Sequence, residues 1–274
     1  MSDLSLIEPY LRGEIDPAFA LRARLILEQV VKQRPQSVLD IGCGRGFYLK
    51  MISYYDFALK IHGIDLKNEH LESAAKVLPE NDKRFNLQQA SVYELPFENE
   101  SMDFVICSEV LEHLDQPLAG ISEIYRVLKK NACVAVSVPQ LQFPFFWDPL
   151  NWLLMRVLKT HVSKDIHWLA GIWADHERLY QRHELEESFK NGFDILKIEN
   201  IVANCLPFSH FVIYGLGKNL VEQGFFKSLN RFSFEKPSLI RKSLALIMRL
   251  PSFLLDDPQN DRIGANLFLL AKKT

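Results

Sequence analysis

A short apolar strand followed by three closely spaced glycines constrains this chain more than any other feature. The stretch runs from Ser37 to Gly46 and reads SVLDIGCGRG. Only residues that lack a Cβ atom can turn this tightly off a strand while a ligand approaches their backbone amides. The sequence therefore predicts a small-molecule site at the carboxyl end of this strand.

Strand-like and helix-like segments alternate along most of the chain. Because helices separate most of the successive strands, we predict an α/β fold with a doubly wound, mostly parallel sheet of seven strands and helices on both faces. The expected strands cover residues 37–41, 61–65, 85–90, 102–107, 132–138, 195–202 and 265–271. The expected helices cover residues 17–33, 47–55, 69–78, 116–129 and 182–191.

Two stretches interrupt this alternation. Residues 141–173 are crowded with aromatic side chains, and residues 204–262 are irregular. We predict one domain over residues 1–274, in which these excursions fold together as a helical lid. The core would cover about 15–140, 177–203 and 263–274, and the lid about 141–176 and 204–262.

Composition narrows the partners and the compartment. A net charge of −2 gives no whole-molecule reason to expect nucleic acid. The four cysteines (Cys43, Cys107, Cys133 and Cys205) form no C-x-x-C pair and lie in apolar settings, so we expect buried thiols in a reducing cytoplasm. No secretory signal opens the chain and no apolar run reaches the ~18 residues of a spanning helix, so a transmembrane anchor is not expected.

The spacing of the glycines favours a cationic cofactor over a dinucleotide. The dinucleotide fingerprint G-x-G-x-x-G needs a third glycine where this chain has Phe47. Asp40 would repel a pyrophosphate at the turn but would suit an ammonium or sulfonium group. Asp65 ends the second strand about twenty residues past the turn, where an acidic side chain binds ribose hydroxyls. The alternative for Asp65 is a cap for the following helix.

Four motifs in the same order resemble those of class I S-adenosylmethionine-dependent methyltransferases of the Rossmann-like superfamily. They are VLDIGCGRG, HGIDL, QASVYELPFENESMDFVICSEVLEHLDQPLAGISEIYRVLKKNACVAVSVP and, more weakly, HERLYQRHELEESFKNGFDILKI. The match extends from about Ser37 to Pro139. It implies S-adenosyl-L-methionine as the cofactor and points to the branch that acts on small or lipid-type molecules.

The resemblance assigns cofactor contacts position by position. The glycine turn would surround the methionine part, Asp65 would hold the ribose, and Ser91 stands where many relatives have an acidic residue facing the adenine. The segment SEVLEH after the fourth strand would line the cofactor and the acceptor side. The predicted cofactor-binding residues are Asp40, Gly42, Cys43, Gly44, Gly46, Asp65, Leu66, Ser91, Val92, Ser108, Glu109 and Val110.

Two histidines are candidates for catalysis. Methyl transfer chiefly requires alignment and exclusion of water, but a hydroxyl acceptor would also need a general base. His113 and His176 fall near the expected acceptor side, and the alternative for each is structural packing. We expect no metal site, because His161 and His167 lack further ligands at a suitable spacing.

The lid indicates a lipophilic acceptor. It carries seven large aromatic residues in its first half, namely Phe143, Phe145, Phe146, Trp147, Trp152, Trp168 and Trp173. Residues 236–254 project as a helix with Arg241, Lys242 and Arg249 on one side and apolar residues on the other. Such a helix can lie on an anionic membrane surface, and the alternative is a surface helix packed on its own core.

The chain is therefore expected to be a methyltransferase that acts on a small, hydrophobic or lipid-linked acceptor, with transfer to oxygen preferred. It would be cytoplasmic, with peripheral association with a membrane left open. A tRNA or protein acceptor is an alternative, disfavoured by the weak net charge and by the absence of an added RNA-binding domain. From another class, the chain could be a non-catalytic, cofactor-binding partner subunit. The oligomeric state is left open.

Overall fold

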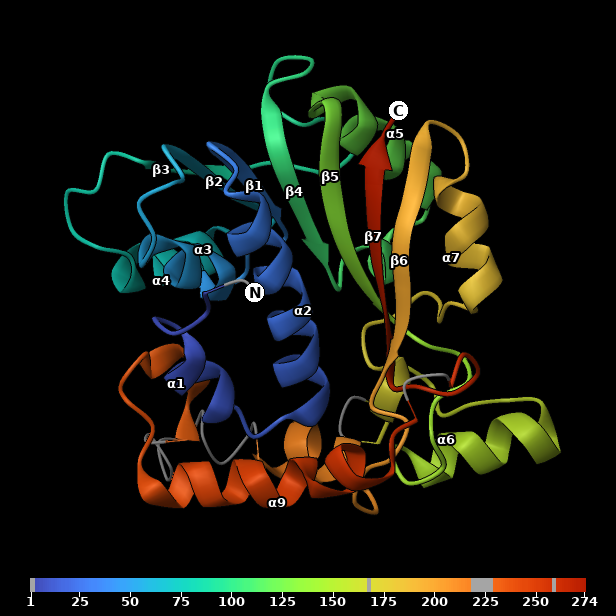
Figure 1. The fold of residues 1–274 in the computed structure, drawn as a ribbon. Helices are drawn as coiled ribbons and strands as arrows, with labels where there is room; N and C mark the ends of the chain where they lie inside the picture. Colours follow the sequence, from blue (N-terminus) through green and yellow to red (C-terminus); the bar gives the residue numbers. More distant parts are fainter. Residues whose placement is uncertain (1–2, 167–168, 218–228, 258–259) are drawn as a thin grey trace.

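One seven-stranded sheet forms the centre of the molecule (Figure 1). The computed structural model describes residues 3–166, 169–217, 229–257 and 260–274. The strand order is β3-β2-β1-β4-β5-β7-β6. Both pairs that involve β7 are antiparallel and the other four are parallel, so the predicted mostly parallel sheet is confirmed. The strands are β1 (Ser37–Ile41), β2 (Lys60–Asp65), β3 (Phe85–Gln89), β4 (Met102–Ser108), β5 (Leu128–Pro139), β6 (Phe193–Ile201) and β7 (Asn266–Lys273).

Helices cover both faces of this sheet. The core helices are α1 (Glu8–Arg12), α2 (Pro17–Gln33), α3 (Phe47–Ser53), α4 (Asn68–Val77), α5 (Pro117–Val127) and α7 (Arg182–Phe189). The helix expected over 116–129 ends earlier, at Val127, because Leu128 is extended and pairs with Met102 of β4. The fifth strand consequently begins four residues before its predicted start.

Two hydrophobic cores lie on opposite faces of the sheet because successive side chains of a strand point in opposite directions. In β4, Phe104 and Ile106 belong to the core beneath α2 and α3, whereas Val105 and Cys107 belong to the core beneath α5 and α7. All four cysteines are buried and free, as predicted. The near-continuous apolar strands thus reflect burial on both sides.

The lid helices gather beyond the carboxyl ends of the parallel strands. Figure 1 shows α6 (Pro149–Leu153) and α9 (Leu239–Leu255) along the lower side of the molecule, toward which β4 points. A π-helical turn, η2 (Leu154–Leu158), continues α6. No helix in the described residues is long and apolar enough to cross a bilayer.

The orientation of α9 agrees only in part with the two interpretations of its sequence, a helix on a membrane surface and a helix packed on its own core. Arg241 is buried and donates to the carbonyl oxygen of Gly13 at 2.8 Å, and Arg249 donates to the carbonyls of Leu11 and Glu14. The prediction of an outward basic face is therefore wrong for these two arginines, because they satisfy backbone carbonyls near the amino end of α2. The packed-helix alternative is confirmed for the side of α9 that carries Arg241 and Ala245, which is buried against α1 and α2, whereas the apolar side of α9 faces outward.

Candidate active site

The glycine turn has the backbone geometry that its sequence predicts. Gly42, Gly44 and Gly46 have φ angles of +64°, +52° and +81°, in the left-handed region that favours glycine. A Cβ atom on Gly42 would lie 2.7 Å from a methyl group of Val110, whereas one on Gly44 would meet nothing within 4 Å. The middle glycine therefore borders open space, and the first packs against the segment after β4.

Two carboxylates flank this turn. Asp65 accepts hydrogen bonds from the backbone of Gly44 at 2.9 Å and from Lys67 at 2.9 Å. Asp40 is buried, and one of its carboxylate oxygens has no hydrogen-bond partner in the part of the chain that the structure describes. Burial and the neighbouring Asp65 raise the pKa of Asp40 well above its ordinary value. A cation that approached Asp40 would relieve this cost.

The other predicted cofactor residues lie around the same edge of the sheet. Cys43 is buried within the turn, and Leu66 is largely exposed just after β2. The hydroxyl of Ser91 accepts from the backbone of Tyr93, whereas Val92 packs into the core beside α5. Ser108 ends β4, and its hydroxyl contacts those of Tyr48 and Ser137. Leu66 and Ser91 thus follow the carboxyl ends of two neighbouring parallel strands, β2 and β3.

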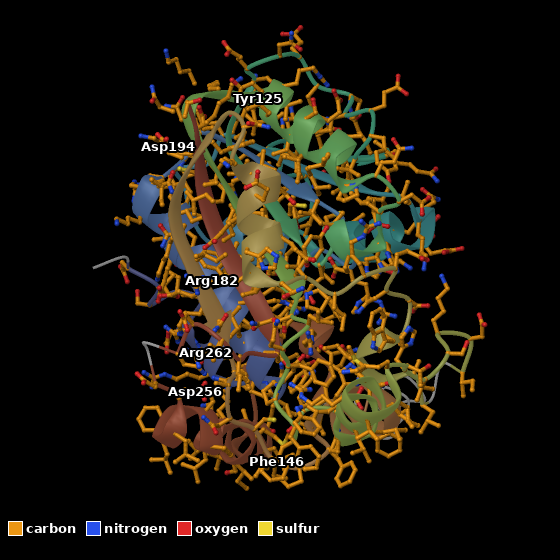
Figure 2. The ribbon with its side chains drawn as sticks, turned by 90° about the vertical axis from the view of Figure 1, so that its right-hand side faces the viewer. Tyr125, Phe146, Arg182, Asp194, Asp256 and Arg262 are labelled. Carbon is orange, nitrogen blue, oxygen red and sulfur yellow. The ribbon has the colours of Figure 1, made fainter. Side chains whose placement is uncertain are left out.

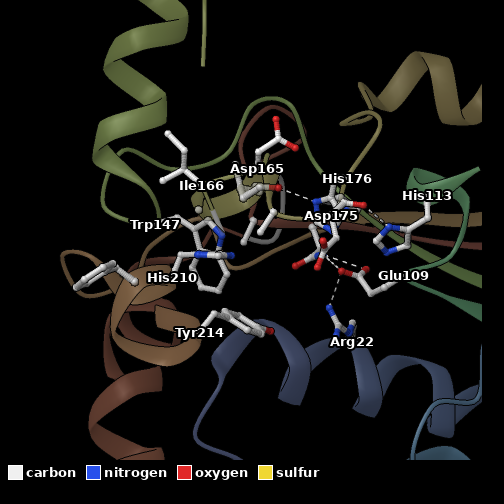
Figure 3. A pocket seen from close by; sticks show the side chains of 17 residues that line it. Arg22, Glu109, His113, Trp147, Asp165, Ile166, Asp175, His176, His210 and Tyr214 are labelled. Atoms are coloured by element: carbon white, nitrogen blue, oxygen red, sulfur yellow. Dashed lines mark hydrogen bonds and ion pairs between the residues drawn. The ribbon is translucent and has the colours of Figure 1, made fainter. Parts of the chain in front are cut away.

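Glu109 projects into a cavity of about 890 Å³ beneath the lid (Figure 3). Its carboxylate accepts from Ser137 and Asn266, each at 2.9 Å, and pairs with Arg22 at 2.9 Å. The backbone of Glu109 is left-handed, with φ +56°. These contacts hold the Glu109 side chain in the cavity, which the two candidate histidines also line.

His113 and His176 lie together in the same cavity, with ring centroids 5.0 Å apart (Figure 3). The Nδ1 atom of His113 lies 2.7 Å from the carbonyl oxygen of Asp175, and that of His176 lies 2.6 Å from the carbonyl oxygen of Ile172. Because a carbonyl oxygen can only accept, each Nδ1 must carry a hydrogen. Burial lowers the pKa of His176, which favours the neutral ring. With the hydrogen on Nδ1, the lone pair of the neutral ring is on Nε2.

Glu112 completes this group, and sequence reasoning missed it. Its carboxylate is fully buried, and neither oxygen has a hydrogen-bond partner among the described residues. Its Oε1 lies 3.9 Å from Nε2 of His113 and 4.0 Å from Nε2 of His176. Burial, and then the charge of Glu109, raise the pKa of Glu112 well above its ordinary value. The prediction of no metal site was based on two other histidines. His161 stacks on Trp173, and His167 lies outside the described residues.

Lid residues close the far side of the cavity. Trp147, His210 and Tyr214 line it, and burial lowers the pKa of His210 to about 4, which keeps that ring neutral. Of the predicted lid aromatics, Phe143 and Trp147 are buried, Phe145 and Phe146 are exposed, and Trp168 lies outside the described residues.

Arg22 is a second residue of the site that sequence reasoning missed, although its position in α2 could have revealed it. It occupies the stripe of α2 that also carries Phe19 and Ile26, three residues before it and four after it. A charge on an otherwise apolar stripe indicates a buried partner.

Comparison with known proteins identifies the family. A model described as a methyltransferase domain matches residues 39–136, which contain the glycine turn, Asp65 and the SEVLEH segment. The chain therefore contains a class I S-adenosylmethionine-dependent methyltransferase domain. A solved S-adenosylmethionine-dependent methyltransferase from Mesorhizobium loti has the same fold, with a TM-score of 0.57, 17% identity and coverage of 93% of this chain and 98% of the other.

Sequence relatives of this methyltransferase differ in their named acceptors. A small RNA 2′-O-methyltransferase of Rattus norvegicus is 29% identical over 142 residues, covering 47% of this chain and 36% of the relative. A ubiquinone biosynthesis O-methyltransferase of Idiomarina loihiensis is 25% identical over 202 residues, covering 72% of this chain and 75% of the relative. This chain thus spans about a third of the length of the small-RNA enzyme.

The residues around the turn fit S-adenosylmethionine, the cofactor of this family. Its methionine part carries an ammonium group and a sulfonium, for which the partnerless oxygen of Asp40 provides a buried anionic neighbour. The open space beside Gly44 leaves room for a ligand against the backbone. Asp65 and Ser91 lie at the adjacent strand ends, where the ribose and adenine are expected.

Proposed function

We propose that this methyltransferase transfers a methyl group to an oxygen atom of a small, hydrophobic or lipid-linked acceptor at a membrane surface. The observation that supports this acceptor class is a set of exposed apolar side chains on the lid. We call it the apolar face; it comprises Phe145, Phe146, Leu150, Leu153, Val157, Leu158, Phe208, Phe211, Val212, Leu239, Ile240, Leu246, Ile247, Leu250, Phe253, Leu254 and Leu255.

The apolar face lies on one side of the molecule. Figure 2 shows Phe146 on the same lower side as α6 and α9. Leu239 and Phe253, near opposite ends of α9, are 82% and 85% exposed. Full burial of a leucine or phenylalanine side chain is worth roughly 1.5–3 kcal/mol, so insertion of several of them gives substantial binding.

Charge and packing favour a lipid bilayer as the occupant of this face. Helix α9 and the segment 149–160 contain lysine and arginine but no acidic residue, and Arg156, Lys159 and Lys242 are exposed. Exposed basic residues beside inserted apolar ones suit an anionic phospholipid surface. Because Arg241 and Arg249 anchor α9 to the core, the apolar side can face the bilayer without unfolding the helix.

The apolar face adjoins the site, which supports delivery of a lipophilic acceptor. Phe211 belongs to the face and also lines the cavity that holds Glu109 and His176. Val212 belongs to the face and lines a second cavity of about 530 Å³ that reaches Gly44. An acceptor that enters from the membrane would meet the cofactor side without crossing water.

The chemistry requires few protein groups. S-adenosylmethionine, when bound, would supply the methyl group to the acceptor oxygen and would leave as S-adenosylhomocysteine. Asp40 and Asp65 position the cofactor, and Trp147 and Tyr214 exclude water. The hydroxyl proton of the acceptor would need a base, and as long as no metal ion occupies them, the Nε2 lone pairs of His113 and His176 are candidates for it.

Labelled methyl transfer tests the acceptor class. The full chain is incubated with methyl-labelled S-adenosylmethionine and a cell extract, which is then separated into lipid, RNA, protein and small polar fractions. Label in the lipid fraction is expected. Label in RNA or protein would contradict the acceptor but not the activity. No label, together with binding of S-adenosylhomocysteine, would favour a partner subunit.

Vesicle flotation tests the membrane surface. The wild-type chain should float with vesicles of phosphatidylcholine and phosphatidylglycerol, and the double variant Leu239→Ser, Phe253→Ser should not. Leu118→Ser is a matched control, because Leu118 is 64% exposed on α5, outside the apolar face. Equal flotation of all three proteins, or flotation of none, would contradict the proposal.

A further inference from the structure

We propose that Glu112, His113 and His176 bind one divalent transition-metal ion, whose remaining positions face the acceptor cavity. One carboxylate oxygen and two ring nitrogens from these residues all lie within 4.8 Å of one another. The carboxylate oxygen is 3.9 Å from one Nε2 and 4.0 Å from the other. Three potential ligand atoms therefore surround one point.

The hydrogen bonds of the two rings direct lone pairs to that point. Each Nδ1 carries its hydrogen toward a backbone carbonyl, of Asp175 for His113 and of Ile172 for His176. In the neutral rings, Nε2 is consequently the acceptor atom on both sides. Metal-binding histidines are commonly held in this way, with the other ring nitrogen donating to a carbonyl or carboxylate.

The carboxylate of Glu112 supplies the strongest reason to expect a cation. It is 0% exposed, and neither of its oxygens has a hydrogen-bond partner in the described structure. Buried polar groups are nearly always paired, and a buried unpaired carboxylate costs several kcal/mol or more. A general base would need one lone pair here, whereas three converge. A single cation satisfies all of them.

The types and spacing of the ligands indicate the class of metal. Two imidazoles and one carboxylate suit zinc or another first-row divalent ion better than calcium or magnesium, which prefer oxygen ligands. In a tetrahedral site with bonds of about 2.1 Å, ligand atoms lie roughly 3.4 Å apart. Movement of about half an ångström would bring the carboxylate oxygen to this spacing from each nitrogen.

The surroundings leave open positions on the cavity side. Both histidines line the cavity of about 890 Å³, and Glu109 lies beside them with its carboxylate already held by Arg22, Ser137 and Asn266. Glu109 therefore adds negative charge near the site. The role of the ion in holding an oxygen-bearing acceptor rests on the proposed function, whereas the binding of the ion does not.

Titration of metal-free protein tests the site. The full chain is treated with a chelator, dialysed, and titrated separately with MnCl₂, CoCl₂ and ZnCl₂ in a calorimeter, with the Co²⁺ absorption spectrum as a second readout. We expect one ion per chain for at least one metal. Loss of an outer hydrogen-bonding partner typically weakens metal binding 10–100-fold, so Glu112→Gln and His176→Asn, which remove direct ligands, should each weaken it by about 100-fold or more.

Two measurements keep a negative result informative. In chelator, Glu112→Gln should be at least as stable as wild type, because the amide removes a buried unpaired charge; this shows that the variant folds. His161→Asn, at a histidine outside the group, should bind the ion as wild type does. Failure of all three metals to bind the wild-type chain, or equal binding by Glu112→Gln, would overturn the proposal. Binding of S-adenosylhomocysteine by the same preparations tests the proposed function separately.

Discussion

The hydroxyl of Tyr214 donates a hydrogen bond to the carboxylate of Asp16, which caps α2, although 198 residues separate the two. The guanidinium of Arg231 also approaches this carboxylate, at 3.5 Å. The buried Asp16 carboxylate therefore links the second lid excursion to helix α2. The lid is held by a polar network as well as by apolar packing.

Replacement of Tyr214 by phenylalanine tests the contribution of this link. The variant should lower the free energy of unfolding by about 1–3 kcal/mol, because it removes a donor from a buried carboxylate. Urea unfolding at pH 7 measures the change. Tyr93→Phe, at an exposed position, should lower stability less. Equal effects of the two variants would show that the Tyr214 bond contributes little.

The charge of Asp16 should make the fold sensitive to acid. Burial favours its neutral form, but Arg231 and Arg22 outweigh burial and keep the pKa of Asp16 below its ordinary value. The resulting stability is present above the unfolded pKa of about 3.9 and is lost as the pH falls through the lower, folded pKa. Unfolding midpoints between pH 7 and pH 3 should fall less steeply for Asp16→Asn than for wild type. Parallel curves would contradict this assignment.

Asp40 should lower the stability of the ligand-free protein and strengthen the binding of the cofactor. Its folded pKa is raised, so the ionised side chain costs stability at neutral pH, and Asp40→Asn should raise the thermal midpoint of the ligand-free protein. The same change should weaken S-adenosylmethionine binding by about 10-fold or more, because a hydrogen bond to a charged group is worth about 1.5–3 kcal/mol. Calorimetry measures the affinity. Asp103→Asn should leave the affinity unchanged, because Asp103 lies near the amino end of β4, away from the glycine turn.

Alanine at two of the glycines should separate packing from ligand space. Gly42→Ala adds a 2.7 Å contact with Val110 to the strain of a left-handed backbone, whereas Gly44→Ala incurs only the strain, about 1–2 kcal/mol. Gly42→Ala should therefore be the less stable variant. Gly44→Ala should fold yet bind S-adenosylhomocysteine more weakly, because its methyl group occupies open space beside the turn. The reverse order of stability would contradict the turn geometry.

The sequence predicts the core far better than the lid. Strand and helix periodicity identified all seven strands, because the central strands β1, β4, β5 and β7 bury apolar residues on both faces of the sheet. The outward apolar side of α9 was not predictable from helical spacing. Its orientation depends on the carbonyls of Gly13 and Leu11, which attract Arg241 and Arg249 from over 200 residues away.

The candidate site was predicted in part for the same reason. His113 and His176 were named individually from motif positions, yet their approach to Glu112 depends on how the loop before α7 returns over β4 and β5. The carbonyls of Ile172 and Asp175, which orient the rings, carry no signal in the identity of their side chains. Local patterns identify ligands on one segment, and the tertiary fold decides which segments meet.

The position of β7 sets a limit on when this fold can form. Within the described residues β6 pairs only with β7, and β7 also completes the pairing of β5. During synthesis, β6 therefore has no place in the sheet until Asn266–Lys273 have left the ribosome. A nascent chain that pauses before those residues would expose one edge of β5, and we expect chaperones to engage it there.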